Sequence, residues 1–199
     1  MEILNKLLYW ISTGLMLPVI VVLLFLFLKS LLALGGFYGD YVARLKAFKT
    51  LTPFINEVAT TSLEGKSVPE GKLPQFVYLK NLLASRHSAV NREKTLADFE
   101  LEMTKQLWTT KTMSKLGPVL GLMGTLIPMG PALVGLASGD IASMAENMQV
   151  AFSTTVVGLI VGAIGFLLTE VKQRWFAKDL SQLIYISDLI TEENETEKK

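Results

Sequence analysis

The run LGPVLGLMGTLIPMGPALVGLASG, residues 116–139, has no charged residue and carries a ladder of very small residues. A second uncharged run, NMQVAFSTTVVGLIVGAIGFLLT at residues 147–169, carries a similar ladder. Steps of three and four place the residues of each ladder on one face of a helix. Such a face buries little side-chain area, but in a membrane it lets helix backbones approach closely. The ladders therefore predict tightly packed membrane helices; their members are Gly117, Gly121, Gly124, Pro128, Pro131, Gly135 and Ser138, then Ala151, Thr155, Gly158, Gly162, Gly165 and Thr169.

The composition excludes several classes of protein. The chain has 199 residues, of which 50% are hydrophobic, and its mean hydropathy is +0.41. A net charge of +1 argues against a nucleic-acid partner held by bulk charge. Cysteine is absent and His87 is the only histidine, which removes His-dependent triads and most zinc sites. We therefore expect neither an enzyme nor a bound metal or cofactor.

Three segments satisfy the length needed to cross a bilayer, about 20 apolar residues. The first lies within residues 1–34, where residues 7–28 are uncharged, and the others are 116–139 and 147–170. A cleaved signal peptide is the competing interpretation of the first segment, but its apolar run is too long. The sequence therefore predicts an all-α, polytopic membrane protein with three transmembrane helices in the cell membrane.

Charge predicts how these helices are oriented. Lys and Arg concentrate in residues 29–115 and recur in the tail, 171–199, whereas the connector 140–146 has only acidic charge. Because positively charged loops stay in the cytoplasm, the middle region and the tail are expected inside and the connector outside. The N-terminus is then outside and the C-terminus cytoplasmic.

The regions outside the spans read as helices. Residues 35–115 divide at a loop near 61–74, and the helix before that loop is expected to break near Pro53. Apolar residues at helical spacing predict that spans two and three extend into a cytoplasmic helical bundle, and a helix lying on the membrane surface is the alternative. The predicted stripes are Leu96, Phe99, Met103 and Leu107, then Trp175, Phe176, Leu180, Leu183 and Ile184.

Titratable groups are absent from the predicted spans, except for Lys29 and Glu170 near their ends. A proton relay needs a group that gains and loses a proton, so a partner would have to supply that group at mid-membrane. The spans offer hydroxyl groups instead, on Thr125, Ser153, Thr154 and Thr155. Each hydroxyl has two possible roles: a local bond to its own or a neighbouring helix, or a place beside a hydrated pore.

Two segments then resemble a known family. LGPVLGLMGTL, residues 116–126, resembles the second-span motif of the MotA/TolQ/ExbB proton channel family, and VAFSTTVVGLI, residues 150–160, resembles its third-span motif. The order of spans and cytoplasmic regions is also similar. The resemblance implies a homopentamer around an ExbD/TolR/MotB-like single-span partner with an intramembrane Asp. By position, Thr125 matches the threonine of the second-span motif, Thr155 matches the pore-facing threonine of span three, and Thr154 lies beside it. We therefore expect Thr125, Thr154 and Thr155 to line the pore, whereas the ladder glycines at 117, 121, 124, 158, 162 and 165 are expected to pack the helices.

The chain also departs from the family pattern. Pro128 and Pro131 follow Thr125, where TolQ- and ExbB-like members usually lack this pair, and they are expected to kink span two. Val150 stands where those members often have a glutamate. The cytoplasmic region is short for a flagellar stator, so a TolQ/ExbB-like transducer is the nearer analogy. The resemblance thus implies a pore-forming subunit of an ion-driven, energy-transducing motor; the alternative is a non-conducting membrane scaffold.

Overall fold

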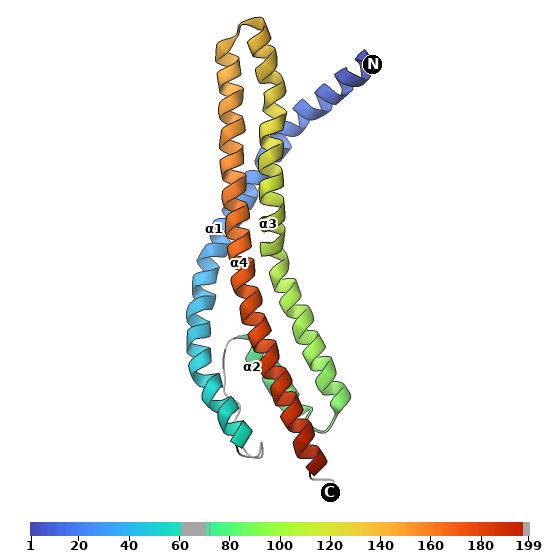
Figure 1. Ribbon diagram of the computed structural model, residues 1–199, viewed down its shortest axis with the longest axis vertical. Coiled ribbons are helices and arrows are strands. Elements are labelled where there is room, and N and C mark those ends of the chain that lie inside the picture. The colour runs from blue at the N-terminus through green and yellow to red at the C-terminus, as the bar shows by residue number, and fades with distance from the viewer. Residues whose placement is uncertain (61–70, 72, 197–199) are drawn as a thin grey trace. The chain divides into compact units, whose positions relative to one another are not determined.

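The computed structural model describes residues 1–60, 71 and 73–196, and within them it contains helices and no strand. The helices are α1 (Glu2–Thr60), α2 (Pro74–Ala84), α3 (Ala89–Ser138) and α4 (Ile141–Thr196) (Figure 1). This confirms the predicted all-α class. Most of the loop predicted near 61–74 lies outside the described residues, and α2 begins at its last position, Pro74.

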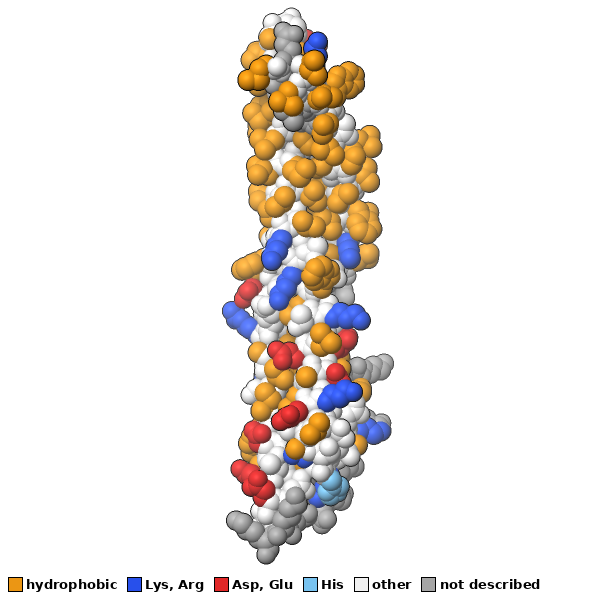
Figure 2. All heavy atoms as spheres, turned by 90° about the vertical axis from the view of Figure 1, so that its right-hand side faces the viewer, with side chains coloured by type: hydrophobic (Ala, Val, Ile, Leu, Met, Phe, Trp, Pro, Cys, Tyr) orange, Lys and Arg blue, Asp and Glu red, His pale blue; other side chains and the backbone are white. Residues whose placement is uncertain are grey.

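Three of these helices are long and apolar enough to cross a membrane. The candidate segments are Tyr9–Ala47, Ala89–Ser138 and Ile141–Thr196. Their lengths of 39, 50 and 56 residues exceed the about 20 residues that a bilayer requires. The chain is therefore a multi-pass membrane protein. In the view of Figure 2, hydrophobic side chains cover most of the upper half of the surface, and the Lys, Arg, Asp and Glu side chains lie mostly in the lower half.

Proline does not interrupt the helices where the sequence suggested it would. The expected break near Pro53 is wrong, because α1 continues through that residue to Thr60. The carbonyl that loses its helical partner there belongs to Lys49, four residues earlier, which like Pro53 is exposed to solvent. The α3 helix also contains Pro118, Pro128 and Pro131, and the kink expected at the last two stays a prediction.

A two-residue turn, Gly139 and Asp140, joins α3 to α4, so α4 begins inside the stretch that the sequence assigned to a connector, 140–146. Gly139 has φ of 77°, a left-handed conformation that glycine adopts without strain. The Asp140 N–H donates to the Gly135 carbonyl (2.8 Å) and the Gly139 N–H to that of Leu136 (3.2 Å), which is a Schellman ending. The Asp140 carboxylate then accepts the Ser143 N–H (3.0 Å) and caps α4.

The chain divides into two compact units, and each has its own core. Unit 1 comprises residues 1–35 and 109–169, and α1, α3 and α4 contribute Leu26, Met113 and Val161 to its core. Unit 2 comprises residues 36–108 and 170–199. Its larger core includes residues from all four helices: Ala47, Leu51, Phe76, Leu79, Leu82, Phe99, Met103, Leu107, Phe176, Leu183, Ile186 and Ile190.

The helical stripes predicted outside the spans are mostly buried in unit 2. Phe99, Met103 and Leu107 lie in its core, as the three-and-four spacing predicted. The tail contributes Phe176 and Leu183 in the same way. Ile184 is the exception: its side chain is 42% exposed, so its assignment to the buried stripe was wrong. Ile184 adjoins Leu183 at about 100° around the helix, at the edge of the buried stripe.

Candidate functional site

The small-residue faces of α3 and α4 pack against each other in unit 1. A Cβ placed on Gly158 would lie 2.6 Å from both the carbonyl oxygen of Gly117 and the Cα of Gly121. A Cβ placed on Gly121 would lie 3.2 Å from the Cα of Gly158. These atoms belong to the backbone and cannot rotate away, so the two helices meet this closely only because both positions lack a side chain.

The same close approach continues along both helices. A Cβ on Gly162 would lie 2.6 Å from the Cγ of Pro118, and one on Gly165 would lie 2.5 Å from the Ser114 nitrogen. In the other direction, a Cβ on Gly124 would lie 2.6 Å from the Cβ of Thr154. Of the six glycines that the sequence singled out, all but Gly121 therefore lie where a Cβ would come within 3.0 Å of the opposite helix, and at Gly121 the contact would still be tight.

Thr155 lies within this seam and contacts both helices. Its side chain is half-buried, and its Oγ1 is 3.1 Å from the Ala151 carbonyl of α4 and 3.3 Å from the Gly121 carbonyl of α3. A hydroxyl has one hydrogen to donate and two lone pairs that accept. The two carbonyls therefore compete for a single hydrogen, and the lone pairs of Thr155 take no part in either bond.

Among the described residues, the hydroxyl groups of Thr154 and Thr125 form hydrogen bonds only within their own helices. Thr154 is 7% exposed, and its Oγ1 lies 3.0 Å from the carbonyls of both Val150 and Ala151 in its own helix. Thr125 is half-buried and donates to the Leu122 carbonyl, at 2.7 Å, again in its own helix. Thr125 is displaced by about 100° around α3 from Gly124, which packs against Thr154. The structure thus brings Thr154 and Thr155 to α3, whereas the hydroxyl bond of Thr125 to Leu122 stays within α3.

A groove between α1 and α4 runs along another side of Thr154. It has a volume of about 300 Å³ and combines apolar residues of α1 with both polar and apolar residues of α4. Ser153 lies on its wall and donates to the Gln149 carbonyl at 2.8 Å. The lining residues are Ile20, Leu23, Leu24, Gln149, Val150, Ser153, Thr154 and Val157. The groove adds polar groups next to the threonines, and Gln149 was not among the candidates that the sequence supplied.

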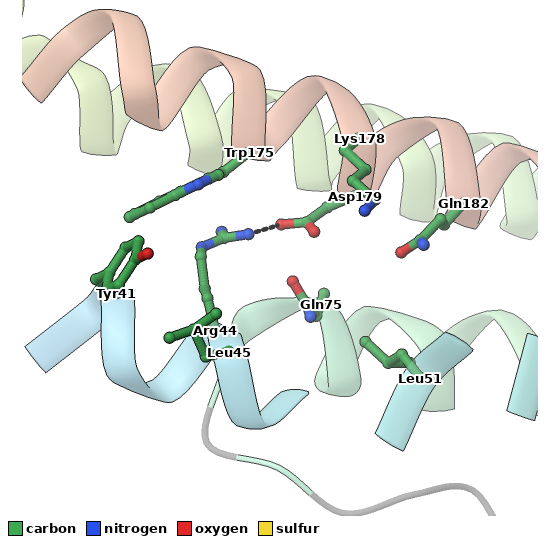
Figure 3. A pocket seen from close by; sticks show the side chains of 9 residues that line it. All are labelled: Tyr41, Arg44, Leu45, Leu51, Gln75, Trp175, Lys178, Asp179 and Gln182. Atoms are coloured by element: carbon green, nitrogen blue, oxygen red, sulfur yellow. Dashed lines mark hydrogen bonds and ion pairs between the residues drawn. The ribbon is translucent and has the colours of Figure 1, made fainter. Parts of the chain in front are cut away.

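Unit 2 contains a buried ion pair that sequence reasoning missed. Arg44 of α1 and Asp179 of α4 form it, with Nη1 and Oδ2 2.6 Å apart (Figure 3). The Arg44 guanidinium lies 5.0 Å from the ring centre of Trp175, a cation–π contact. With its amide nitrogen turned towards Asp179, Gln75 donates to both carboxylate oxygens, at 2.8 and 2.9 Å. These residues line a cavity of about 180 Å³.

The sequence contains one feature that indicates the Arg44–Asp179 ion pair. Asp179 follows Phe176 by three residues and precedes Leu183 by four, so an acid stands on the apolar face of the tail helix. Burial raises the pKa of the Asp179 carboxyl above its ordinary value of 3.8, and the Arg44 guanidinium partly opposes that rise. A charge at a core position of a helix predicts a buried partner, although not which residue supplies it.

The predicted ion pathway has no titratable group of its own. Residues 116–139 and 147–169 contain no Asp, Glu, Lys, Arg or His. His87 is exposed in unit 2. Within the described part of the chain, no group of three or more His, Cys, Asp or Glu side chains is placed to hold a metal ion. The chemistry that the chain offers in its spans is hydrogen bonding by hydroxyl, amide and carbonyl groups.

Comparison with known proteins places this arrangement in a family. The family model described as the MotA/TolQ/ExbB proton channel family matches residues 81–184, slightly more than half of the 199 residues. The chain belongs to the MotA/TolQ/ExbB proton channel family. The matched range contains α3 and most of α4, and with them both glycine ladders and all three candidate threonines.

A curated relative supports the same family. This protein, described as a biopolymer transport protein ExbB homolog of Methanothermobacter thermautotrophicus strain Delta H, is 41% identical over 63 residues. The aligned part is 31% of this chain and 23% of the relative, so the chain spans about a quarter of the relative's length. The family is one of channels rather than enzymes, which agrees with the non-enzymatic function that the composition predicted.

Proposed function

We propose that the chain is a pore-forming subunit of a proton-driven, energy-transducing membrane complex. In this complex several copies of the chain, five by family resemblance, surround an ExbD/TolR/MotB-like single-span partner whose intramembrane Asp carries the proton. The N-terminus lies outside and the C-terminus in the cytoplasm. Membership of a proton channel family supports the proton as the transported ion. The absence of any titratable group from residues 116–139 and 147–169 supports the need for a partner that carries one.

The observation that carries the proposal is the position of Thr155. Its hydroxyl lies between the Ala151 and Gly121 carbonyls, within hydrogen-bond reach of each, and its lone pairs remain for a further donor. A protonated carboxyl group donates a hydrogen bond, whereas a carboxylate only accepts one. Thr155 therefore accepts from the partner's protonated Asp and, by turning its hydrogen away from the carbonyls, donates to the deprotonated form.

The glycine seam has a supporting role in this proposal. Because Gly121 and Gly158 bring the two backbones together, the Gly121 carbonyl comes within 3.3 Å of Thr155 Oγ1. The seam thus sets the direction of the hydroxyl without any side chain that could compete for the proton. Thr125, one residue beyond Gly124, borders the pathway next to the seam, and Thr154, which packs against Gly124, lies on the pathway beside Thr155.

Proton uptake by vesicles tests the proposal. The chain and a single-span partner with an intramembrane Asp are reconstituted together, and uptake is followed with a pH-sensitive dye under an imposed potential. Thr155→Val removes the hydroxyl and keeps the shape of the side chain. The loss of one hydrogen bond, about 0.5–1.5 kcal/mol, corresponds to an uptake rate lower by about two- to tenfold. Thr155→Ser keeps the hydroxyl and should restore most of the rate.

Thr169→Val is the matched control. Thr169 is a buried α4 threonine whose hydroxyl donates to the Gly165 carbonyl of its own helix, at 2.7 Å. Its removal should leave the uptake rate within the error of the assay. Two outcomes would contradict the proposal: equal uptake rates for Thr155→Val and Thr169→Val, or no uptake with the partner present. The chain would then be better described as a non-conducting scaffold, for which glycine packing is equally suitable.

A further inference from the structure

The face of α3 that points away from the core of unit 2 carries large apolar side chains. Val90, Leu101 and Trp108 are 75%, 70% and 72% exposed. Leu101 lies two positions from both Phe99 and Met103, which are buried, so it projects from nearly the opposite side of the helix. With Lys94 and Lys105 these residues recur at helical spacing, and we refer to Val90, Lys94, Leu101, Lys105 and Trp108 as the α3 stripe.

The α3 stripe is not expected to face the lipid hydrocarbon. Leu101 precedes the uncharged run at residue 116 by about four turns of helix. The helix around it carries Glu100, Glu102 and Lys105, a density of charge that is stable in water and costly in hydrocarbon. Apolar side chains that stay exposed together in an aqueous region typically mark an interaction site.

A second exposed stripe, on α4 of the same unit, has the opposite charge. Ala177, Ser181, Ile184, Asp188 and Glu192 follow one another in steps of three or four, and all five are exposed. We refer to these residues as the α4 stripe. Its charged members are both acidic, whereas those of the α3 stripe, Lys94 and Lys105, are both basic and outnumber Asp98, the exposed acid at the edge of that stripe. The two stripes are therefore complementary in charge, and each has an apolar residue at its centre.

The two stripes also share a common level along the helices. Arg92 Nη2 lies 2.7 Å from Thr191 Oγ1, and Asn194 Nδ2 lies 2.7 Å from the Arg86 carbonyl. Because the two helices are antiparallel, residue numbers rise along α3 as they fall along α4. A residue of α3 therefore lies beside the residue of α4 that brings the sum of the two numbers to roughly 280, as in these two pairs. Lys94 is consequently at the level of Asp188, within about two residues, although the two side chains project from different helices.

We infer that the α3 stripe of one copy of the chain docks on the α4 stripe of a second copy. The inference rests on the proposed assembly of several copies in one membrane complex. Copies that share a membrane are related by rotation about an axis along its normal, which leaves every residue at its own level. Lys94 of one copy therefore meets Asp188 of the next. Because the two surfaces differ, the contact is heterologous and repeats around a closed ring.

Cysteine cross-linking tests this contact directly, since the chain has no cysteine of its own. Full-length chains with Lys94→Cys and with Asp188→Cys, carrying different tags, are co-expressed with the partner and oxidised in the membrane. A disulfide requires Cα atoms within about 7 Å, so we expect a cross-linked band that contains both tags. Chains that carry only one of the substitutions should not cross-link to themselves, because the contact is not symmetric.

Two further variants make the test specific. Lys80→Cys, at an exposed position of α2, replaces Lys94→Cys in a control that should give no mixed-tag band. Leu101→Glu adds a negative charge opposite the acidic α4 stripe and should reduce the mixed-tag band several-fold, whereas Leu101→Met should not. The helical content of both Leu101 variants is measured by circular dichroism, so that a loss of the band through misfolding is recognised.

The outcomes separate this inference from the proposed function. Absence of the mixed-tag band in membranes that retain proton uptake would overturn the docking of the stripes and leave the function standing. Docking is overturned equally if Lys94→Cys cross-links to itself, or if Leu101→Glu leaves the band unchanged. A mixed-tag band without any uptake in the presence of the partner would support the contact and overturn the function.

Discussion

Gly158 of α4 lies directly against Gly121 of α3, so that a Cβ on Gly158 would approach the Cα of Gly121 to 2.6 Å. Both atoms belong to helix backbones, and neither can move without its helix. The pair therefore sets the separation of the two helices at the level of Thr155. Without a hydrophobic driving force between helices in lipid, such close packing is a main source of their association.

Gly158→Ala is expected to weaken the α3–α4 pair. The added methyl group overpacks the seam, at a cost of about 1–3 kcal/mol in the free energy of unfolding. Gly130→Ala in α3 is the matched control, because a Cβ there has no neighbour within 4 Å. Thermal unfolding of the purified protein in detergent, followed by circular dichroism, compares the two variants. An equal midpoint for both would show that the seam tolerates a side chain.

Arg44→Leu is expected to destabilise unit 2 more than the double variant Arg44→Leu/Asp179→Leu. The side chains of Arg44 and Asp179 are only 14% and 7% exposed, so removal of one partner leaves the other charge buried and unpaired. Such a loss typically costs about 3–5 kcal/mol, whereas apolar replacement of both partners is often neutral. The midpoints of thermal unfolding of the single and double variants provide the comparison, and a double variant that is less stable than Arg44→Leu would contradict the expectation.

The loss of stability caused by Arg44→Leu should become smaller as the pH is lowered. Burial already raises the pKa of Asp179 above 3.8, and loss of the Arg44 guanidinium, which lowers that pKa, raises it further. The folded variant then binds a proton at a pH where the unfolded chain keeps its carboxylate. Stability therefore rises as the pH falls through the raised pKa and levels off below 3.8.

Unfolding midpoints measured in detergent between neutral pH and the ordinary carboxyl range test this dependence on pH. Arg44→Leu/Asp179→Asn is the control, since the introduced amide does not titrate and this double variant should show no recovery. A defect of Arg44→Leu that stays constant or grows on acidification would indicate that Asp179 is not the group responsible.

Single cysteines are expected to label from opposite sides of the membrane. Ala142→Cys, at an exposed position just after the α3–α4 turn, should react in intact cells with a membrane-impermeant maleimide. Lys80→Cys in α2 should react only after the cells are permeabilised. Label on the purified chain reports only the introduced residue, because the natural chain has no cysteine. The reverse pattern would place the N-terminus in the cytoplasm and invert the proposed topology.

The helices and their membrane character were predictable because they depend on local periodicity. Uncharged runs at 116–139 and 147–169 predict spans, and apolar residues at three-and-four spacing predict the buried stripe of Phe99, Met103 and Leu107. The proline residues were harder to interpret. Whether a helix continues through Pro53 depends on whether solvent or a neighbour satisfies the freed carbonyl, which the sequence around it does not reveal.

The sequence by itself determined that α3 and α4 each present a face of small residues, and that their spans contain hydroxyls but no titratable group. Only the tertiary structure decided that these faces meet each other, that Thr155 rather than Thr125 reaches a carbonyl of the other helix, and that Arg44 finds Asp179 across 135 positions of sequence. Helical spacing specifies which residues share a face because each turn repeats the same local geometry. Which face meets which is decided by the packing of whole helices, through contacts between residues far apart in the chain.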